Sequence, residues 1–599
     1  MTKANIVFCM KVAAAWAGLT LMVQAADVQL TGPFPDDLRS KLSGGSLLVE
    51  QSAAETPPST QDILSAAQAD YRRLLAVLYG HGYYGGVISI QLDGREASSI
   101  VPVNPPKSVT TVLVRVDPGP VFKFSQARIA PLPTRSQPHD SFAVGQVATL
   151  GALRSAVEKG VEDWRGAGHA KAALKSQTIV ARHVSAELSA DLVLAPGPKL
   201  TFGPLQTAGN VRTRTDRLID IAGLPVGRTF DPEEVARAAN RLRRTGAFQS
   251  IAMIEAEGVG PNDTQIITAQ VTEAKLRRFG FGFEVATQEG GGLRAFWMHR
   301  NLLGGAEKLR FDAEIKGIGG TIGGMDYRLG VRFDRPATFN EDTNFYALAE
   351  IEQEDGENLF SRQASVGVGI ERIASEKRRY RFGLGLRRGL TRDAFGERDY
   401  TLFEFPLGVN FDYRDVELDP RKGYYADIGV TPFLTLSGAD SGVLSLADLR
   451  GYHSFGEDKR TTLAIRAQVG SLYGPSLADA PADFLFFSGG GGTVRGHEYQ
   501  SLGVDLGGGN IVGGRSFVNV SAEVRWRSQG SFGLVAFADA GYVGEEEFFD
   551  GSGEWQTGAG VGLRYDTRIG PIRVDLAVPT SGETTDTQYQ IYIGIGQSF

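Results

Sequence analysis

Several segments in the carboxy-terminal half of the sequence alternate between apolar residues and mostly charged residues. In segment 307–316 the odd positions from Leu309 to Ile315 are apolar and the even positions are charged. Segments 326–334, 379–387 and 572–578 keep the same apolar face, and the opposite positions are charged apart from three glycines and one alanine. Because successive side chains of a strand point to opposite faces, each segment has one apolar and one charged face. A soluble β-sandwich also alternates, but lipid outside and water inside a closed barrel explain both faces, so the pattern favours a membrane barrel.

Residues 275–599 are predicted to form this barrel. They are rich in glycine: 23 of the 76 glycines precede residue 274 and 53 follow it. Segments separated by Gly, Asp, Asn and Pro turns give about sixteen antiparallel strands with alternating short turns and longer loops. The final segment 589–599 places Ile591, Ile593, Ile595 and Phe599 on one face. We therefore expect Phe599 to lie on the lipid face of the last strand.

The amino-terminal half repeats a pattern of strand, Pro-Gly-Pro turn and strand, at 118–120 and again at 196–198. A further strand of the same kind at 265–271 completes three modules. Their predicted boundaries are 26–118, 119–197 and 198–274. Each contains a helix closed by glycine, and the third has the order β-α-α-β-β. Such modules could be inert spacers, or could bind an extended peptide along an exposed strand edge.

Residues 1–25 resemble a secretory signal. Lys3 and Lys11 precede an apolar run at 12–23, and Ala25 ends a small-residue cleavage pattern. A retained membrane anchor is the alternative, although the run is shorter than the ~20 residues that a spanning helix needs. The single cysteine, Cys9, lies in this segment, so the mature chain offers no thiolate for a structural metal site. No later run of 18 apolar residues occurs, which excludes a helical membrane protein.

Enzymatic, metal and nucleic-acid functions find little support. The net charge is −7 and no basic stripe could follow a phosphate backbone. The acidic residues of 412–419 lack the donor pattern of a calcium loop and indicate a turn with solvated charges. The glycines of 558–562 lack the Gly-Lys-Ser/Thr of a phosphate loop and suit a tightly coiled strand. We expect no catalytic residue, no cofactor and no metal.

Several barrel motifs together resemble a known family. Segment 487–497 has glycines followed by Val-Arg-Gly, with His497 in the usual aromatic position. Segment 411–424 resembles the family's hairpin, 537–541 its Phe-x-Asp strand, and 558–575 the strands before the carboxy terminus. In this order they resemble the TamA family, the outer-membrane subunit of the translocation and assembly module. That family belongs to the superfamily of barrel-assembly and two-partner-secretion translocators.

The resemblance implies an α+β region of three POTRA modules before the all-β barrel. Three POTRA domains are typical of TamA, whereas BamA typically has five and two-partner-secretion transporters two. It also implies the outer membrane of a Gram-negative bacterium, with the POTRA domains in the periplasm. The implied function is assisting the insertion of autotransporters and other β-barrel proteins. A two-partner-secretion channel or a passive pore remains the alternative.

The same resemblance implies three kinds of partner and no nucleic acid. An inner-membrane-anchored TamB-like protein would bind the periplasmic part of the chain. Unfolded outer-membrane proteins and autotransporters would be its clients. Lipid of the outer membrane would surround the barrel.

The resemblance places Arg495 at the tip of a loop folded into the barrel lumen. Strand alternation turns Phe537, Asp539 and Glu523 inward, and a guanidinium pairs well with carboxylates. We therefore expect a lumenal latch. Its predicted members are Val494, Arg495, Gly496, Phe537, Asp539 and Glu523. The alternative is an arginine that only solvates the pore, and the role of His497 stays open.

A lateral seam is predicted between the first and last strands. Gly280 and Gly282 lie in the first strand, and Gly594 and Gly596 lie in the last, which ends at Phe599. Glycines leave a strand held mainly by its hydrogen-bond ladder, so this seam should open toward lipid. Its freed edges could then pair with an incoming client strand. Glycines that only relieve crowding at barrel closure are the alternative.

Overall fold

The computed structural model describes residues 26–54, 57–456, 458–568, 570–581 and 589–599. The expected signal at 1–25 lies outside the described residues. Contacts divide the chain into two units, one with the first two modules and one with most of the third module and the barrel. Among the described helices, none is both long and apolar enough to span a membrane.

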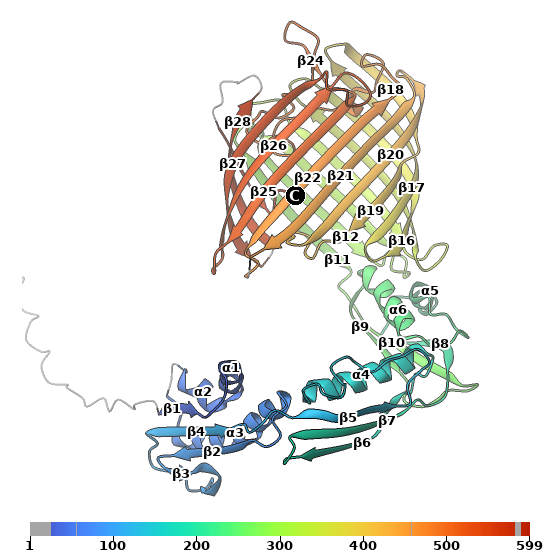
Figure 1. Ribbon diagram of the computed structural model, residues 1–599. Helices are drawn as coiled ribbons and strands as arrows, with labels where there is room; N and C mark the ends of the chain where they lie inside the picture. Colours follow the sequence, from blue (N-terminus) through green and yellow to red (C-terminus); the bar gives the residue numbers. More distant parts are fainter. Residues whose placement is uncertain (1–25, 55–56, 457, 569, 582–588) are drawn as a thin grey trace, which may run out of the picture. The chain divides into compact units, whose positions relative to one another are not determined.

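The first module is a four-stranded sheet covered by helices (Figure 1). Its strands are β1 (Asp27–Thr31), β4 (Thr111–Asp117), β2 (Val87–Leu92) and β3 (Arg95–Glu96), in that spatial order. Its helices are α1 (Asp36–Gly45), α2 (Leu47–Ser52) and α3 (Thr60–Gly80). Leu64, Leu74 and Val114 are fully buried between helices and sheet and form its core.

The second module has three strands, arranged in space like β1, β4 and β2 of the first, and fewer helices. Strands β5 (Lys123–Ala130) and β7 (Glu187–Ala195) are parallel, and β6 (Ala173–Arg182) forms the edge. One helix, α4 (Leu150–Gly166), covers the sheet, and residues 131–149 form turns and bends. This module therefore has one helix over its sheet, as the sequence predicts for it.

The third module has the predicted order β-α-α-β-β. It consists of β8 (Thr201–Ala208), α5 (Thr215–Ala222), α6 (Pro232–Arg244), β9 (Phe248–Glu255) and β10 (Thr264–Glu273). Gly223 ends α5 in the left-handed region with φ of 58°. The carboxylate of Asp231 accepts a hydrogen bond from the backbone N–H of Glu233 at the start of α6.

Seventeen strand segments close into a barrel after the third module. The first ten are β11 (Arg277–Ala286), β12 (Gly290–Arg300), β13 (Lys308–Ile318), β14 (Asp326–Arg335), β15 (Thr343–Asp355), β16 (Phe360–Ser375), β17 (Arg378–Asp393), β18 (Gly396–Glu404), β19 (Leu407–Asp412) and β20 (Gly423–Ser437). The others are β21 (Gly442–Phe455), β22 (Thr461–Tyr473), β25 (Ser516–Arg527), β26 (Phe532–Gly544), β27 (Glu554–Thr567), β28 (Gly570–Ser581) and β29 (Gln590–Ile595).

Two of these segments are halves of one strand, so the barrel has the sixteen strands that the sequence predicts. Both β18 and β19 pair with β17 on one side and with β20 on the other. The break falls at Pro406, which has no N–H to donate to a ladder.

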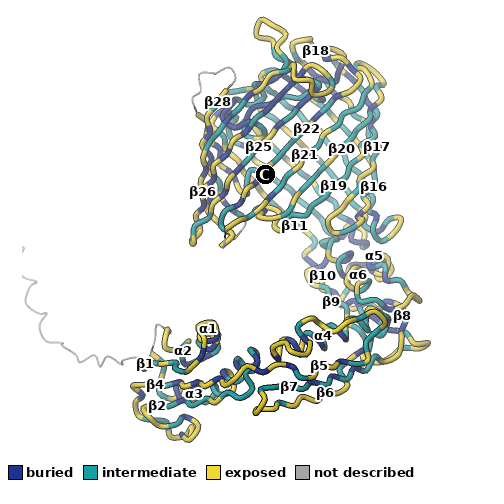
Figure 2. Tube along the Cα trace, in the orientation of Figure 1, coloured by how far each residue is buried: buried dark blue, intermediate teal, exposed yellow. Residues whose placement is uncertain are grey.

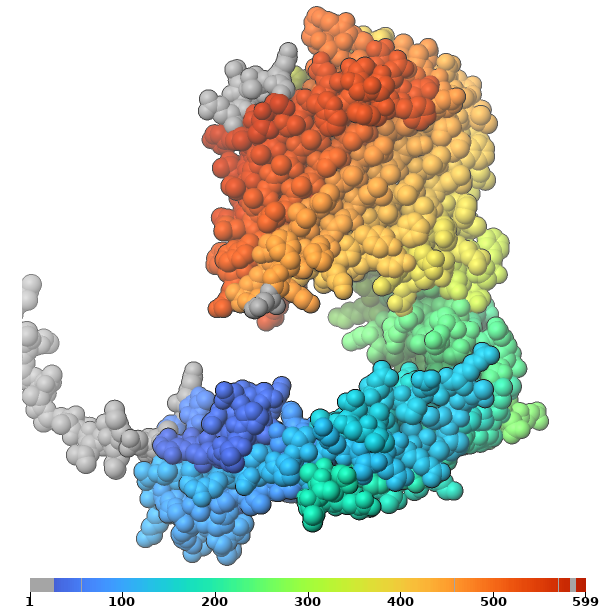
Figure 3. Space-filling model, viewed as in Figure 1, coloured from blue at the N-terminus to red at the C-terminus, as the bar shows by residue number. Residues whose placement is uncertain are grey.

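The barrel wall has an apolar outside and a polar inside. Phe281, Leu434 and Val561 expose 85%, 54% and 60% of their surface on the outer face. Asn519, Glu523 and Asp575 point inward and are fully buried. Buried and exposed positions alternate along β25 and β26 (Figure 2). The space-filling view shows the outer surface of β20 to β25 as a continuous wall (Figure 3).

Helix α6 of the third module contacts the barrel turn between β14 and β15. Arg241 and Arg244 both donate hydrogen bonds to the carboxylate of Asp342. Burial opposes ionisation of this carboxyl, but the two arginines outweigh it and hold the pKa of Asp342 below its usual range. We call this end of the barrel the near rim and the opposite end the far rim.

Candidate functional site in the barrel lumen

The loop between β22 and β25, residues 474–515, carries the candidate site. It contains a 3-10 turn, Ala482–Phe484, and two short strands, β23 (Val504–Asp505) and β24 (Ile511–Val512). Phe484 and Leu485 pack with the inward-facing Tyr400, Leu402 and Phe433. Val494 and Arg495 are 0% and 3% exposed. The loop is therefore folded into the barrel.

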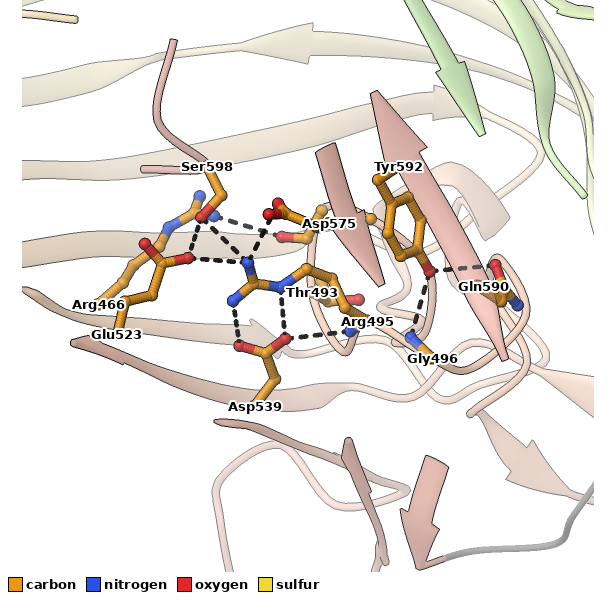
Figure 4. A network of polar contacts seen from close by, with 12 residues as sticks. Arg466, Thr493, Arg495, Gly496, Glu523, Asp539, Asp575, Gln590, Tyr592 and Ser598 are labelled. Carbon is orange, nitrogen blue, oxygen red and sulfur yellow. Dashed lines mark hydrogen bonds and ion pairs between the residues drawn. The ribbon is translucent and has the colours of Figure 1, made fainter. Parts of the chain in front are cut away.

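Arg495 lies among carboxylates from three different strands (Figure 4). Its Nε and Nη2 donate to the two oxygens of Asp539, at 2.7 and 2.9 Å. Its Nη1 donates to Glu523 at 2.8 Å, and the same nitrogen lies 3.7 Å from Asp575. The backbone N–H of Arg495 also donates to Asp539. Both predicted carboxylates are thus brought to Arg495.

The three carboxylates differ in how far their negative charge is compensated by Arg495. Glu523 also pairs with Arg525, and Asp575 also pairs with Arg564. Among the described residues, the cation paired with Asp539 is Arg495 alone. Asp575 was missed as a partner of the loop, although the alternation of 572–578 already turned it inward.

The ring of Phe537 completes the arginine site. The Arg495 guanidinium carbon lies 3.5 Å from its centroid, within the range of a cation–π contact. Phe537 and Asp539 are two residues apart on β26, so both reach the lumen from one strand face. The Phe-x-Asp strand thus supplies both an aromatic face and a carboxylate to the same guanidinium.

Glycines in β27 let the loop approach the wall. A Cβ on Gly558 would lie 2.0 Å from the carbonyl oxygen of Arg495. A Cβ on Gly562 would lie equally close to the carboxylate of Asp575, and one on Gly560 would meet the Phe537 ring at 2.4 Å. The expectation that these glycines serve strand coiling misses this role, which requires knowing what lies against the strand.

We expect Gly558→Ala to displace the loop without removing any charge. Its methyl group would overlap the main chain of Arg495, and a backbone atom cannot move aside as a flexible side chain can. Limited proteolysis of the folded protein should show cleavage within 489–500 that the parent protein resists. Gly451→Ala in β21 is the matched control, because a Cβ there meets nothing within 4 Å. Equal protease resistance of the two variants would contradict the role of Gly558.

The residues after Arg495 connect the loop to the last strand. The backbone N–H of Gly496 donates to the hydroxyl of Tyr592 on β29, and this hydroxyl donates to Gln590 (Figure 4). His497 is buried, with Nε2 3.0 Å from the carbonyl oxygen of Thr557 on β27. His497 therefore has a packing position against the wall.

The seam between β11 and β29 is short. Over the described lengths of both strands, the ladder consists of two residue pairs, Val285 with Ile593 and Ala286 with Tyr592. Thr287 adds hydrogen bonds to Ile591 at the far rim. In the part of the chain that the structure describes, residues 277–284 of β11, including Gly280 and Gly282, have no partner strand on this side. Gly594 pairs with Arg573 of β28 instead.

The final residues correct one prediction. Phe599 does not lie on the lipid face: it is 7% exposed, packs with Tyr452, and lies beneath the guanidinium of Arg525. The reason is Gly596, whose φ of 94° turns the chain away from the extended strand. Residues 596–599, here called the tail, therefore enter the lumen.

Comparison with known proteins supports this architecture. The model of the Omp85 superfamily domain matches residues 301–599. The chain belongs to the Omp85 superfamily. The POTRA model, described as a surface antigen variable number repeat, matches residues 200–274, which is nearly the third module.

Two solved structures share the fold of this Omp85 protein. The crystal structure of BamA from Haemophilus ducreyi lacking POTRA domains 1–3 has a TM-score of 0.63 at 17% identity, covering 79% of this chain and all of that one. CdiB from Acinetobacter baumannii has a TM-score of 0.50 at 10% identity, covering 80% of this chain and 90% of that one. At such identities the likeness concerns the fold.

Proposed function

We propose that this Omp85 protein assists the insertion of β-barrel proteins into the outer membrane. The observation that carries the proposal is the seam, because two residue pairs join β11 to β29 while fifteen join β16 to β17. On the side facing β29, residues 277–284 of β11 have no strand partner among the described residues, and such an edge can accept a strand of another chain. Their outer face carries Phe279, Phe281 and Phe283, so a client strand paired here would already face lipid.

The proposal includes partners and location. The POTRA modules would extend into the periplasm, dock unfolded clients and bind an inner-membrane-anchored TamB-like protein. Edge strands such as β6, with exposed Ile179 and Val180, offer surfaces for such docking. Autotransporters are the client class that the TamA-like motifs favour. None of these roles requires catalytic chemistry.

A polypeptide translocation channel is the second candidate. A cavity of 680 Å³ lies along the inner side of β12 to β18, next to Phe484 of the loop. The charged residues that line it include Arg294, Arg310, Arg332 and Glu350. A charged surface of this kind suits a passing polar chain. The loop and the tail occupy other parts of the lumen, which favours the seam over the lumen as the client's route.

Reconstitution separates the two functions. The purified protein in lipid vesicles is mixed with an unfolded outer-membrane barrel or with an unfolded secreted polypeptide. We expect the barrel to become protease-resistant and heat-modifiable in these vesicles faster than in empty ones. Protection of the secreted polypeptide inside the vesicles, without faster barrel insertion, would favour the channel and contradict the proposal.

A further inference from the structure

The turn between β19 and β20, residues 413–422, reaches across the near rim to the tail. In the barrel wall, β21, β22, β25, β26 and β27 stand between β20 and β28, the strand that pairs with β29. The turn nevertheless contacts Arg527 at the end of β25, and the Leu418 side chain lies over Gly570 and Gly596. We call residues 413–422 the strap.

Asp419 is the polar centre of these contacts. One carboxylate oxygen accepts a hydrogen bond from the Gln597 side chain at 3.1 Å, and the other pairs with Arg527. The carbonyl oxygen of Leu418 accepts from the backbone N–H of Gln597. The Asp419 side chain is 18% exposed, so the expectation of a turn with freely solvated charges is wrong at this position.

The lumenal wall holds the tail from the other side. Arg564 donates to the Gln597 side chain, Arg495 to the Ser598 hydroxyl, and Arg525 to the carbonyl oxygen of Phe599. The tail is thus held between the strap and the same arginine network that anchors the loop. These three hydrogen bonds fix the position of the tail in the lumen.

The seam register shows where the tail could otherwise go. Pairing of Val285 with Ile593 and of Ala286 with Tyr592 would, if continued, place Phe283 opposite Ile595 and Gly282 opposite Gly596. An extended tail would therefore add rungs along residues 279–282 of β11. These backbone groups are part of the edge that stays unpaired in the structure.

We propose that the strap, through Asp419, holds the tail in the lumen and so keeps the edge of β11 unpaired. Asp419 acts as a positioning residue: it contacts the tail and the end of β25, and its described contacts do not include β11. The consequence for client insertion rests on the proposed function. The position of the tail does not, because pairing of β11 with β29 can be measured without any client.

The test is a cysteine pair that reports seam closure. Phe283→Cys with Ile595→Cys places both thiols on the exposed outer face, and neither side chain is one of the polar partners of the tail named above. We expect Asp419→Ala to raise the disulfide yield of this pair roughly three- to tenfold, the range expected for losing a hydrogen bond or two. Asp419→Asn, which keeps an oxygen for Gln597 but loses the charge facing Arg527, should give an intermediate yield.

Two controls make the result specific. Glu417→Ala removes an equal charge from the strap without a side-chain contact to the tail, and should leave the yield unchanged. Val285→Cys with Ile593→Cys, already paired in the structure, should crosslink equally in all variants and shows that the barrel is folded. An unchanged disulfide yield between positions 283 and 595 in both Asp419 variants would contradict the proposal that the strap holds the tail in the lumen.

A client assay run in parallel keeps the two proposals apart. If Asp419→Ala closes the seam and slows barrel insertion, both proposals stand. If the crosslink rises while insertion stays normal, the strap stands and the edge of β11 is not the route of the client. The second result would therefore contradict the proposed function alone.

Discussion

Oxidation of Val285→Cys with Ile593→Cys is expected to abolish client insertion, and reduction to restore it. These residues form one of the two rungs that join β11 to β29. A few backbone hydrogen bonds contribute about 0.5–1.5 kcal/mol each, so thermal opening of so short a ladder is accessible. A covalent bond at the same place cannot open on the timescale of insertion.

The control for this lock is a disulfide elsewhere in the wall. Val469→Cys with Val518→Cys joins β22 to β25, which eleven residue pairs already hold together. Insertion by this variant should be the same in its oxidised and reduced forms. Insertion at the normal rate by the oxidised 285–593 variant would exclude lateral opening and leave the lumen as the route.

Arg495→Ala is expected to release the loop and lower client insertion strongly. Removing one member of a buried ion pair costs about 3–5 kcal/mol, because the other charge stays buried without compensation, although lumenal water reduces this cost. The carboxylate left without a paired cation is that of Asp539, since Glu523 still pairs with Arg525 and Asp575 still pairs with Arg564. Protease cleavage within 489–500 should become several times faster.

A double variant tests whether the uncompensated carboxylate causes the effect. Asp539→Asn keeps the shape of Asp539 and removes its charge, so Arg495→Ala with Asp539→Asn should be more protease-resistant than Arg495→Ala alone. Arg495→Lys should be intermediate, because an ammonium cannot reproduce the two parallel bonds to Asp539. If the double variant is no better than Arg495→Ala, charge compensation is not what holds the loop.

Strand alternation predicts which side chains of the barrel wall face the site in the lumen. It turned Phe537, Asp539 and Glu523 inward correctly, and the same reasoning applied to Asp575 would have added the third carboxylate. Alternation depends only on the extended backbone, so it holds wherever the strand continues. The location of Arg495, by contrast, came from the resemblance of its loop motif.

The errors fall where contacts are distant in sequence. Strand alternation, continued past Gly596, predicts a lipid-facing Phe599, but the chain leaves the strand at Gly596. The local sequence predicts a solvated Asp419, because its partners Arg527 and Gln597 lie more than one hundred residues away. The glycines of β27 make room for a loop that arrives from another part of the chain. A local sequence pattern does not indicate such contacts between distant parts of the chain.

Depletion of the protein in its native bacterium, followed by a quantitative census of outer-membrane and secreted proteins, tests its role as an assembly factor most directly. Assembly through the seam predicts that a subset of β-barrel proteins, autotransporters foremost, disappears from the outer membrane while secreted polypeptides stay at normal levels. Loss of secreted polypeptides with an unchanged set of outer-membrane barrels would contradict it and identify a translocation channel.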